Sequence, residues 1–178
     1  SFDISLLDTT THGGLKNYQW VNRPLAMVGT VMRQDGTTVN IDIGHDPNDG
    51  VLLIADLAPH VDRDFLERRN REVIQTEELD PILALTRDAA ARALKEKYNL
   101  TPEDFGTADL QIVPAQMPVD IGLDKQLVGA YGHDDRSCAF ASLHALLDLG
   151  GTPEHTACAL LADKEEIGSY GSTGMESN

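Results

Sequence analysis

The sequence predicts an α/β protein, with a mixed α+β portion followed by a helix and a buried strand near the C-terminus. Strand-like runs joined by a hairpin signal dominate residues 25–43. Near the C-terminus a helical pattern leads into a short apolar run, as where a helix precedes a buried strand of a parallel sheet.

The first half of the chain is expected to be mainly strands. Apolar and polar residues alternate from Phe2 to Leu6. Two β-rich runs, Leu25–Met32 and Thr37–Ile43, flank Asp35-Gly36, a dipeptide that strongly favours a hairpin turn. The apolar run Val51–Leu57 predicts a third strand.

Helices are expected further along the chain. Asp80-Pro81 is typical of a helix start, with an N-cap followed by Pro, and we expect that helix to end near Asn99. Alternation at residues 108–113 then predicts another strand. A second, amphipathic helix is expected over residues 136–150, followed by a strand at Thr156–Ala162 that is buried on both faces.

Charge and composition exclude some classes of function. The 14 basic and 29 acidic residues give a net charge of −15, which argues against binding nucleic acid or an anionic membrane surface. No apolar run of about 18 residues suggests a membrane span, so a soluble cytoplasmic protein is expected. Cys138 and Cys158 fall in apolar stretches without metal-ligand spacing, which predicts buried, reduced thiols.

Acidic residues flank the last predicted helix and strand. Asp134 stands at or just before the first turn of the helix, and Glu165 and Glu166 follow the strand. Because ligands bind beyond the carboxyl ends of strands in open α/β sheets, these carboxylates could converge on a divalent cation. The alternative is that Asp134 caps the helix and the glutamates lie in a solvated loop.

The segments around these carboxylates are 129–136, 163–169 and 171–174. They resemble the two internal metal-site motifs of the M18 metalloaminopeptidases, the aspartyl aminopeptidase family. The resemblance implies that Asp134 bridges two metal ions, expected to be zinc, that Glu165 is the general base, and that Glu166 is a terminal metal ligand. It also implies hydrolysis of peptides from the N-terminus, with a preference for Asp or Glu there.

Residues 12–25 are similar to the family's entry into its dimerisation domain, although Asn22 and Pro24 stand where aspartates are usual. The implied architecture is a mixed α+β dimerisation domain, 14–131, inserted in a zinc-peptidase-like α/β catalytic domain. Of that catalytic domain only the segments 1–13 and 132–178 are present. His60 corresponds to a histidine at the family's dimer interface that contacts substrate in the partner's active site. The alternative for His60 is a solvated loop residue.

Family members are more than twice as long and take further ligands, histidines and a carboxylate, from segments that have no match here. We therefore expect this chain to be an internal portion of an enzyme and inactive alone. The family also implies homodimers that build a larger homo-oligomer, expected to be a dodecamer. Two other interpretations stay open, a related peptidase of the M42 type and a non-catalytic module for dimerisation or assembly.

Overall fold

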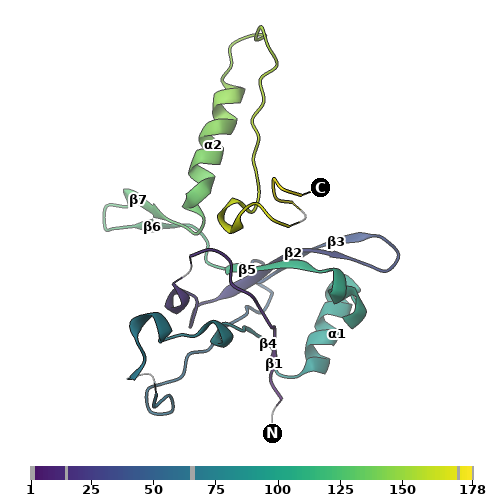
Figure 1. Ribbon diagram of the computed structural model, residues 1–178, viewed down its shortest axis with the longest axis vertical. Helices are drawn as coiled ribbons and strands as arrows, with labels where there is room; N and C mark the ends of the chain where they lie inside the picture. The colour runs from purple at the N-terminus through teal and green to yellow at the C-terminus, as the bar shows by residue number, and fades with distance from the viewer. Residues whose placement is uncertain (1–2, 15, 65–66, 172, 178) are drawn as a thin grey trace. The chain divides into compact units, whose positions relative to one another are not determined.

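The computed structural model describes residues 3–14, 16–64, 67–171 and 173–177. The chain divides into two compact units, Ser1–Gln116 and Met117–Asn178, here called unit 1 and unit 2 (Figure 1). Each has its own pattern of strands and helices. Phe2, where the predicted alternation begins, lies outside the described residues.

Unit 1 is built on an antiparallel sheet of three strands, in the order β3-β2-β5. The central strand β2 (Leu25–Met32) pairs with β3 (Thr38–Ile43) on one side and with β5 (Asp109–Pro114) on the other. The predicted hairpin is confirmed: Gly36 has φ +83° and Asp35 accepts hydrogen bonds from the amide and hydroxyl of Thr37. Local turn chemistry therefore sets the register of β2 and β3.

The predicted strand Val51–Leu57 is wrong in extent, because only Leu52, Leu53 and Ile54 make isolated bridges. Each of these residues contacts a different partner, so no continuous ladder forms. A short strand β1 (Ser5–Leu6) pairs with β4 (Ile82–Ala84). Unit 1 also contains short segments of 3-10 helix: η1 (Asn17–Gln19), η3 (Asn70–Glu72), η4 (Thr76–Glu78) and η5 (Pro102–Thr107).

The first helix, α1, spans Arg87–Tyr98. The prediction that it starts at Asp80-Pro81 is wrong, since residues 82–84 form β4 and Asp80 accepts a hydrogen bond from the Thr9 amide at 2.9 Å. The true N-cap is Thr86, whose hydroxyl accepts from the Ala89 amide at 3.1 Å. The predicted end is confirmed, because Asn99 has the left-handed conformation that terminates helices.

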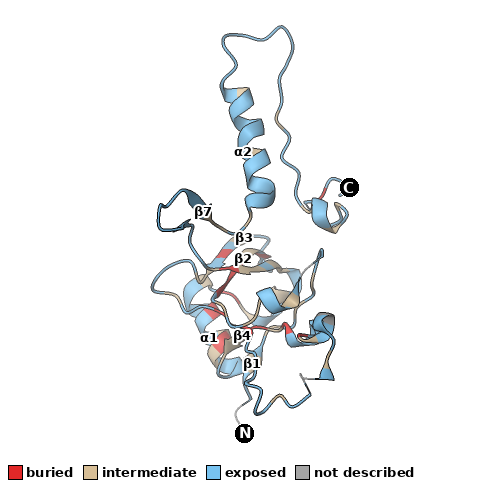
Figure 2. Cartoon of the chain, turned by 90° about the vertical axis from the view of Figure 1, so that its left-hand side faces the viewer, coloured by how far each residue is buried: buried red, intermediate tan, exposed pale blue. Residues whose placement is uncertain are grey.

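The hydrophobic core lies in unit 1, where Figure 2 shows buried residues along β2. Strand residues of the sheet pack against one face of α1 and against the segments that precede and follow that helix. The buried core residues are Leu25, Met27, Val31, Ile41, Leu52, Ile54, Ile74, Leu79, Leu94 and Leu100.

Unit 2 consists of a small hairpin, a helix and a long return segment. Strand β6 (Val119–Ile121) pairs with β7 (Leu127–Gly129), and α2 spans His133–Leu147. After α2 the chain reverses and brings the 3-10 turn η6 (Glu165–Ile167) back to the level of the helix's N-terminal end (Figures 1 and 2). Neither helix in the described part of the chain combines the length and apolarity that crossing a membrane requires.

Two predictions for unit 2 are wrong. Residues 156–162 form no strand, because no described residue pairs with them as a strand requires. Cys138 and Cys158 are free, as expected, but exposed. The second helix is confirmed, yet none of its residues is buried, and Phe140 and Leu147 are 64% and 66% exposed.

Candidate metal-binding site

Asp134 lies at the start of α2, before the regular helical turns. Its own backbone is extended, with φ −87° and ψ 113°, and the peptide bond that joins it to Asp135 is cis. Gly132, in the left-handed conformation, occupies the N-cap and offers no side-chain cap. No described residue donates a hydrogen bond to the Asp134 carboxylate, so the structure does not use this side chain as a helix cap.

The next carboxylate in α2, Asp135, is used within the helix. It accepts a hydrogen bond from the Cys138 thiol, and this bond, reinforced by the negative charge of Asp135, raises the pKa of Cys138 above its ordinary value. Asp135 is therefore already engaged within α2.

Glu165 and Glu166 are presented by η6, between two residues in the left-handed conformation, Lys164 (φ +60°) and Gly168 (φ +85°). The Ser169 amide donates to the Lys164 carbonyl at 2.8 Å and closes this turn. Both glutamates are exposed. Two successive carboxylates therefore lie exposed on a tight backbone turn.

The base of the loop is tied at Asp163, which forms a parallel bridge with Gly174. One Asp163 oxygen accepts from the Lys164 amide at 2.8 Å and the other from the Thr173 hydroxyl. Gly174 is buried, and a Cβ there would lie 2.0 Å from the Ser169 carbonyl oxygen. Asp163, Thr173 and Gly174 were not among the predicted site residues. An Asp at the head of an acidic run, with a Gly-rich stretch following it, is the signal that could have identified them.

The three predicted carboxylates are suitable metal ligands, but they do not form a complete ligand set. Asp134, Glu165 and Glu166 are exposed, and no hydrogen bond or ion pair with another described residue engages their side chains. Carboxylate oxygens suit zinc and other divalent cations. Within the described ranges, however, no three His, Cys, Asp or Glu residues are grouped so that they could hold a metal ion. The return segment brings η6, which carries both glutamates, to the level of the N-terminal end of α2 (Figure 1).

His60 belongs to unit 1, on an exposed turn. The Ala58 carbonyl oxygen accepts from the amides of Val61 at 2.9 Å and Asp62 at 3.1 Å, which bends the chain at this histidine. Asp62 lies 3.9 Å from the Arg68 guanidinium, which anchors the end of the turn. The His60 ring contacts no described residue through a hydrogen bond, so it is available to a partner.

Comparison with known proteins identifies the family. The model of the family described as aminopeptidase I zinc metalloprotease (M18) matches residues 3–178. The chain belongs to the M18 family. This excludes the M42-type alternative and confirms the resemblance, including the expectation that the family is one of zinc-dependent aminopeptidases.

The M18 relatives are much longer than this chain. A protein described as "Probable M18 family aminopeptidase 1" from Borrelia garinii subsp. bavariensis is 42% identical over 98% of this chain and 41% of its own length. The crystal structure of an M18 aminopeptidase from Thermotoga maritima superposes with a TM-score of 0.86 at 38% identity, over 98% of this chain and 40% of that one. The mixed α/β fold is therefore that of M18 enzymes, and the chain spans about two fifths of their length.

A more distant structure, a dodecamer of mApe1 from S. cerevisiae, superposes with a TM-score of 0.59 at 22% identity. It covers 96% of this chain and 40% of the yeast chain. At this identity the likeness concerns the fold alone.

Proposed function

We propose that the whole protein carrying this chain is a metal-dependent aminopeptidase that removes N-terminal residues, preferentially Asp or Glu, from peptides. The observation that carries the proposal is the pair of exposed, unengaged carboxylates of Glu165 and Glu166 on a loop tied by Asp163 and Gly174. Membership of the M18 family supplies the reaction class.

In this proposal Asp134 and Glu166 hold two zinc ions with ligands from other parts of the protein. Asp134 would serve as the shared ligand that the family motif implies, since each of the two oxygens of a carboxylate can coordinate a metal. The ions, when bound, polarise the scissile carbonyl group and make water more acidic. Glu165 accepts a proton from the attacking water at a carboxylate oxygen and transfers it to the leaving amine.

Assembly is the second part of the proposal. Residues 14–131 act as an inserted dimerisation domain between catalytic segments 1–13 and 132–178, and His60 extends to the substrate in the partner's active site. Dimers build a larger homo-oligomer, as the yeast dodecamer suggests by analogy of fold. This chain alone is then inactive, and the whole protein works in the cytoplasm. The net charge of −15 requires a local cationic group to bind an acidic N-terminal residue.

The test uses the whole protein loaded with zinc. Glu165→Gln should lower the hydrolysis of peptides with N-terminal Asp, Glu or Leu by about 10²–10⁴-fold, since a general base is lost. Its zinc content after dialysis should equal that of the unaltered protein, whereas Glu166→Ala should lose zinc. Glu154→Gln, an exposed glutamate elsewhere in unit 2, is the matched control and should change neither.

A second candidate function is a non-catalytic assembly module. The incomplete ligand set among the described residues favours it for the chain on its own. If the zinc-loaded whole protein cleaves none of the three peptides, or if Glu165→Gln stays fully active, the catalytic assignment fails and the module interpretation replaces it.

A further inference from the structure

Strand β3 is an outer strand of the unit 1 sheet, and one of its edges faces away from β2. The Asp42 amide donates to the Tyr98 hydroxyl oxygen at 3.0 Å, and the Tyr98 hydroxyl donates back to the Asp42 carbonyl oxygen at 2.5 Å. Both backbone groups of Asp42 therefore point away from β2. Because alternate residues of an antiparallel strand direct their backbone groups to the same side, those of Thr38 and Asn40 also face outward. Such an edge is a template for pairing with another strand.

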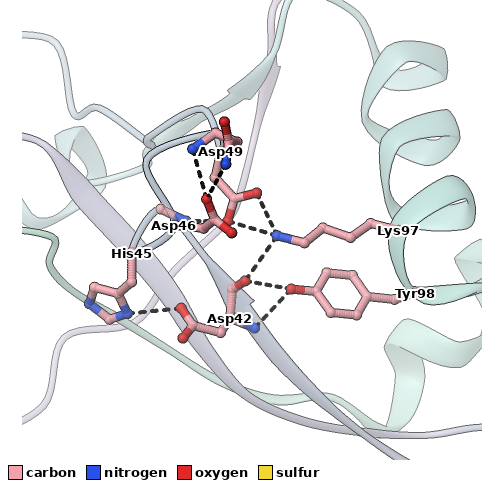
Figure 3. A network of polar contacts seen from close by, with 8 residues as sticks. Asp42, His45, Asp46, Asp49, Lys97 and Tyr98 are labelled. Carbon is pink, nitrogen blue, oxygen red and sulfur yellow. Dashed lines mark hydrogen bonds and ion pairs between the residues drawn. The ribbon is translucent and has the colours of Figure 1, made fainter.

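The end of α1 occupies the C-terminal half of this edge (Figure 3). Besides the Tyr98 hydroxyl, the Lys97 ammonium donates to the Asp42 carbonyl oxygen at 3.3 Å. The next outward amide, that of Gly44, donates to the Asp49 carboxylate at 3.2 Å. Lys97 holds that carboxylate through both oxygens, at 2.5 and 2.7 Å. Among the described residues, Tyr98 and Lys97 thus bond the backbone at position 42, and Lys97 also holds the Asp49 carboxylate that accepts from Gly44.

The side chains of β3 itself offer little further protection against pairing with another strand. Its six residues carry one charged side chain, that of Asp42, and this is bonded to the His45 ring at 2.8 Å. Two copies of the strand paired antiparallel about Asn40 would set Asp42 opposite Thr38, so the charges would not meet. Identical edges are complementary in this arrangement, because each brings the same donors and acceptors.

We propose that the C-terminal end of α1 is an edge guard that prevents β3 from pairing with β3 of another copy of the protein. With Lys97 and Tyr98 in place, the open outward positions of β3 among the described residues are Thr38 and Asn40, which is shorter than an ordinary strand of about five residues. Without the guard the whole strand is open. The inference does not depend on peptidase activity.

The test uses the whole protein with Tyr98→Phe, which removes only the hydroxyl, and the double variant Tyr98→Phe with Lys97→Met. Hydrogen exchange at the Asp42 amide should become about fivefold to tenfold faster in Tyr98→Phe, the effect of losing one hydrogen bond. In sedimentation velocity the double variant should form species larger than the wild-type assembly as concentration rises. Thr86→Ala weakens the same helix at its other end and is the control; it should sediment like wild type.

A rescue variant separates edge pairing from loss of stability. Asn40→Pro, added to the double variant, removes an outward amide and should abolish the larger species, since proline is tolerated on edge strands. The proposal is overturned if the double variant shows fast exchange at Asp42 yet sediments like wild type. It is equally overturned if Thr86→Ala associates to the same degree, or if Asn40→Pro fails to rescue. Should the double variant not fold, Tyr98→Phe alone, which keeps the ring, decides the question by the same criteria.

Discussion

Unit 1 and unit 2 differ in what holds their backbones in place. Unit 1 buries a core of aliphatic side chains around β2. In unit 2, among the described residues from 117 onward, only Gly174 is buried, and the shape of the loop at 163–177 comes from backbone hydrogen bonds and from Asp163. The candidate carboxylates all belong to unit 2. The segment that carries the candidate carboxylates is therefore not the segment that folds by burial.

The largest expected effect comes from comparing two leucine-to-alanine substitutions, one in each unit. Leu100, which is 2% exposed, lies in the core, whereas Leu147 on α2 is 66% exposed. Leu100→Ala should lower the free energy of unfolding of this chain by about 2–5 kcal/mol, through lost burial and a residual cavity. Leu147→Ala should change it by less than about 0.5 kcal/mol. Urea unfolding followed by circular dichroism measures both, and equal costs would erase the distinction between the units.

Substituting one glycine in each unit by alanine should separate effects on stability from effects on zinc binding. A Cβ at Gly29, where φ is +144°, would lie 2.1 Å from the Asp109 carbonyl oxygen across the sheet. Gly29→Ala should cost about 1–3 kcal/mol of unfolding free energy because the backbone must shift. Gly50→Ala, at a position with open space, is the control in the same unit.

The corresponding glycine in unit 2 is Gly174, where a Cβ would lie 2.0 Å from the Ser169 carbonyl oxygen. Since Gly174 approaches the Ser169 backbone closely and bridges to Asp163 at the base of the loop that carries Glu165 and Glu166, Gly174→Ala should reduce zinc retention by the whole protein and leave the urea midpoint of this chain nearly unchanged. Gly150→Ala, also in open space, should affect neither. A Gly174→Ala protein that keeps its zinc would show that the loop does not position a ligand.

The helices provide a smaller contrast. Thr86 caps α1 through its side chain, but Gly132 at the start of α2 has no side chain to do so. Thr86→Ala should lower the unfolding free energy by about 1 kcal/mol, while Thr86→Ser, which keeps the hydroxyl, should lower it by much less. Thermal unfolding of both variants checks this, and a cap that contributes nothing would give identical curves.

The smallest effect is a change of stability with pH, which should appear only in acid. Hydrogen bonds from the amide and hydroxyl of Thr101 and from the Gln34 amide hold the pKa of buried Asp104 below its ordinary value of 3.8. The charged form therefore stabilises the fold above that value, and the contribution is lost as the pH falls through the lower pKa of the folded state. The stability difference between wild type and Asp104→Asn should shrink over this range. A difference independent of pH between neutrality and acid would contradict the assignment.

Much of unit 1 could be predicted from sequence because the signals are local. Asp35-Gly36 determines its turn whatever surrounds it, and the two flanking strands follow from alternation. The start of α1 was misplaced because Pro81 is equally compatible with a strand entry, and pairing with β1 and residue 53 decided between them. Residues 51–57 and 156–162 have the apolar composition of strands. Pairing, however, depends on a neighbour that composition does not reveal.

The candidate site was predictable only in part. The sequence identified Asp134, Glu165 and Glu166 through the family motifs, and these residues lie at a helix start and on a tied turn, as polar loop residues should. Their convergence, the role of His60 and the domain boundaries stay predictions, because each depends on contacts between segments far apart in sequence. The exposure of Cys138 has the same cause: an apolar neighbourhood in sequence predicts burial only when another surface covers it.

Several hydrogen bonds link the β2–β3 hairpin to segments more than sixty residues away. The Arg33 guanidinium donates to the Tyr98 carbonyl oxygen at 2.6 Å, the Gln34 amide donates to Asp104, and the Thr107 hydroxyl donates to the Met32 carbonyl oxygen at 2.6 Å. The hairpin cannot detach without freeing the end of α1 and the turn η5. These three elements should consequently open as one cooperative unit, with a common protection factor in native-state hydrogen exchange.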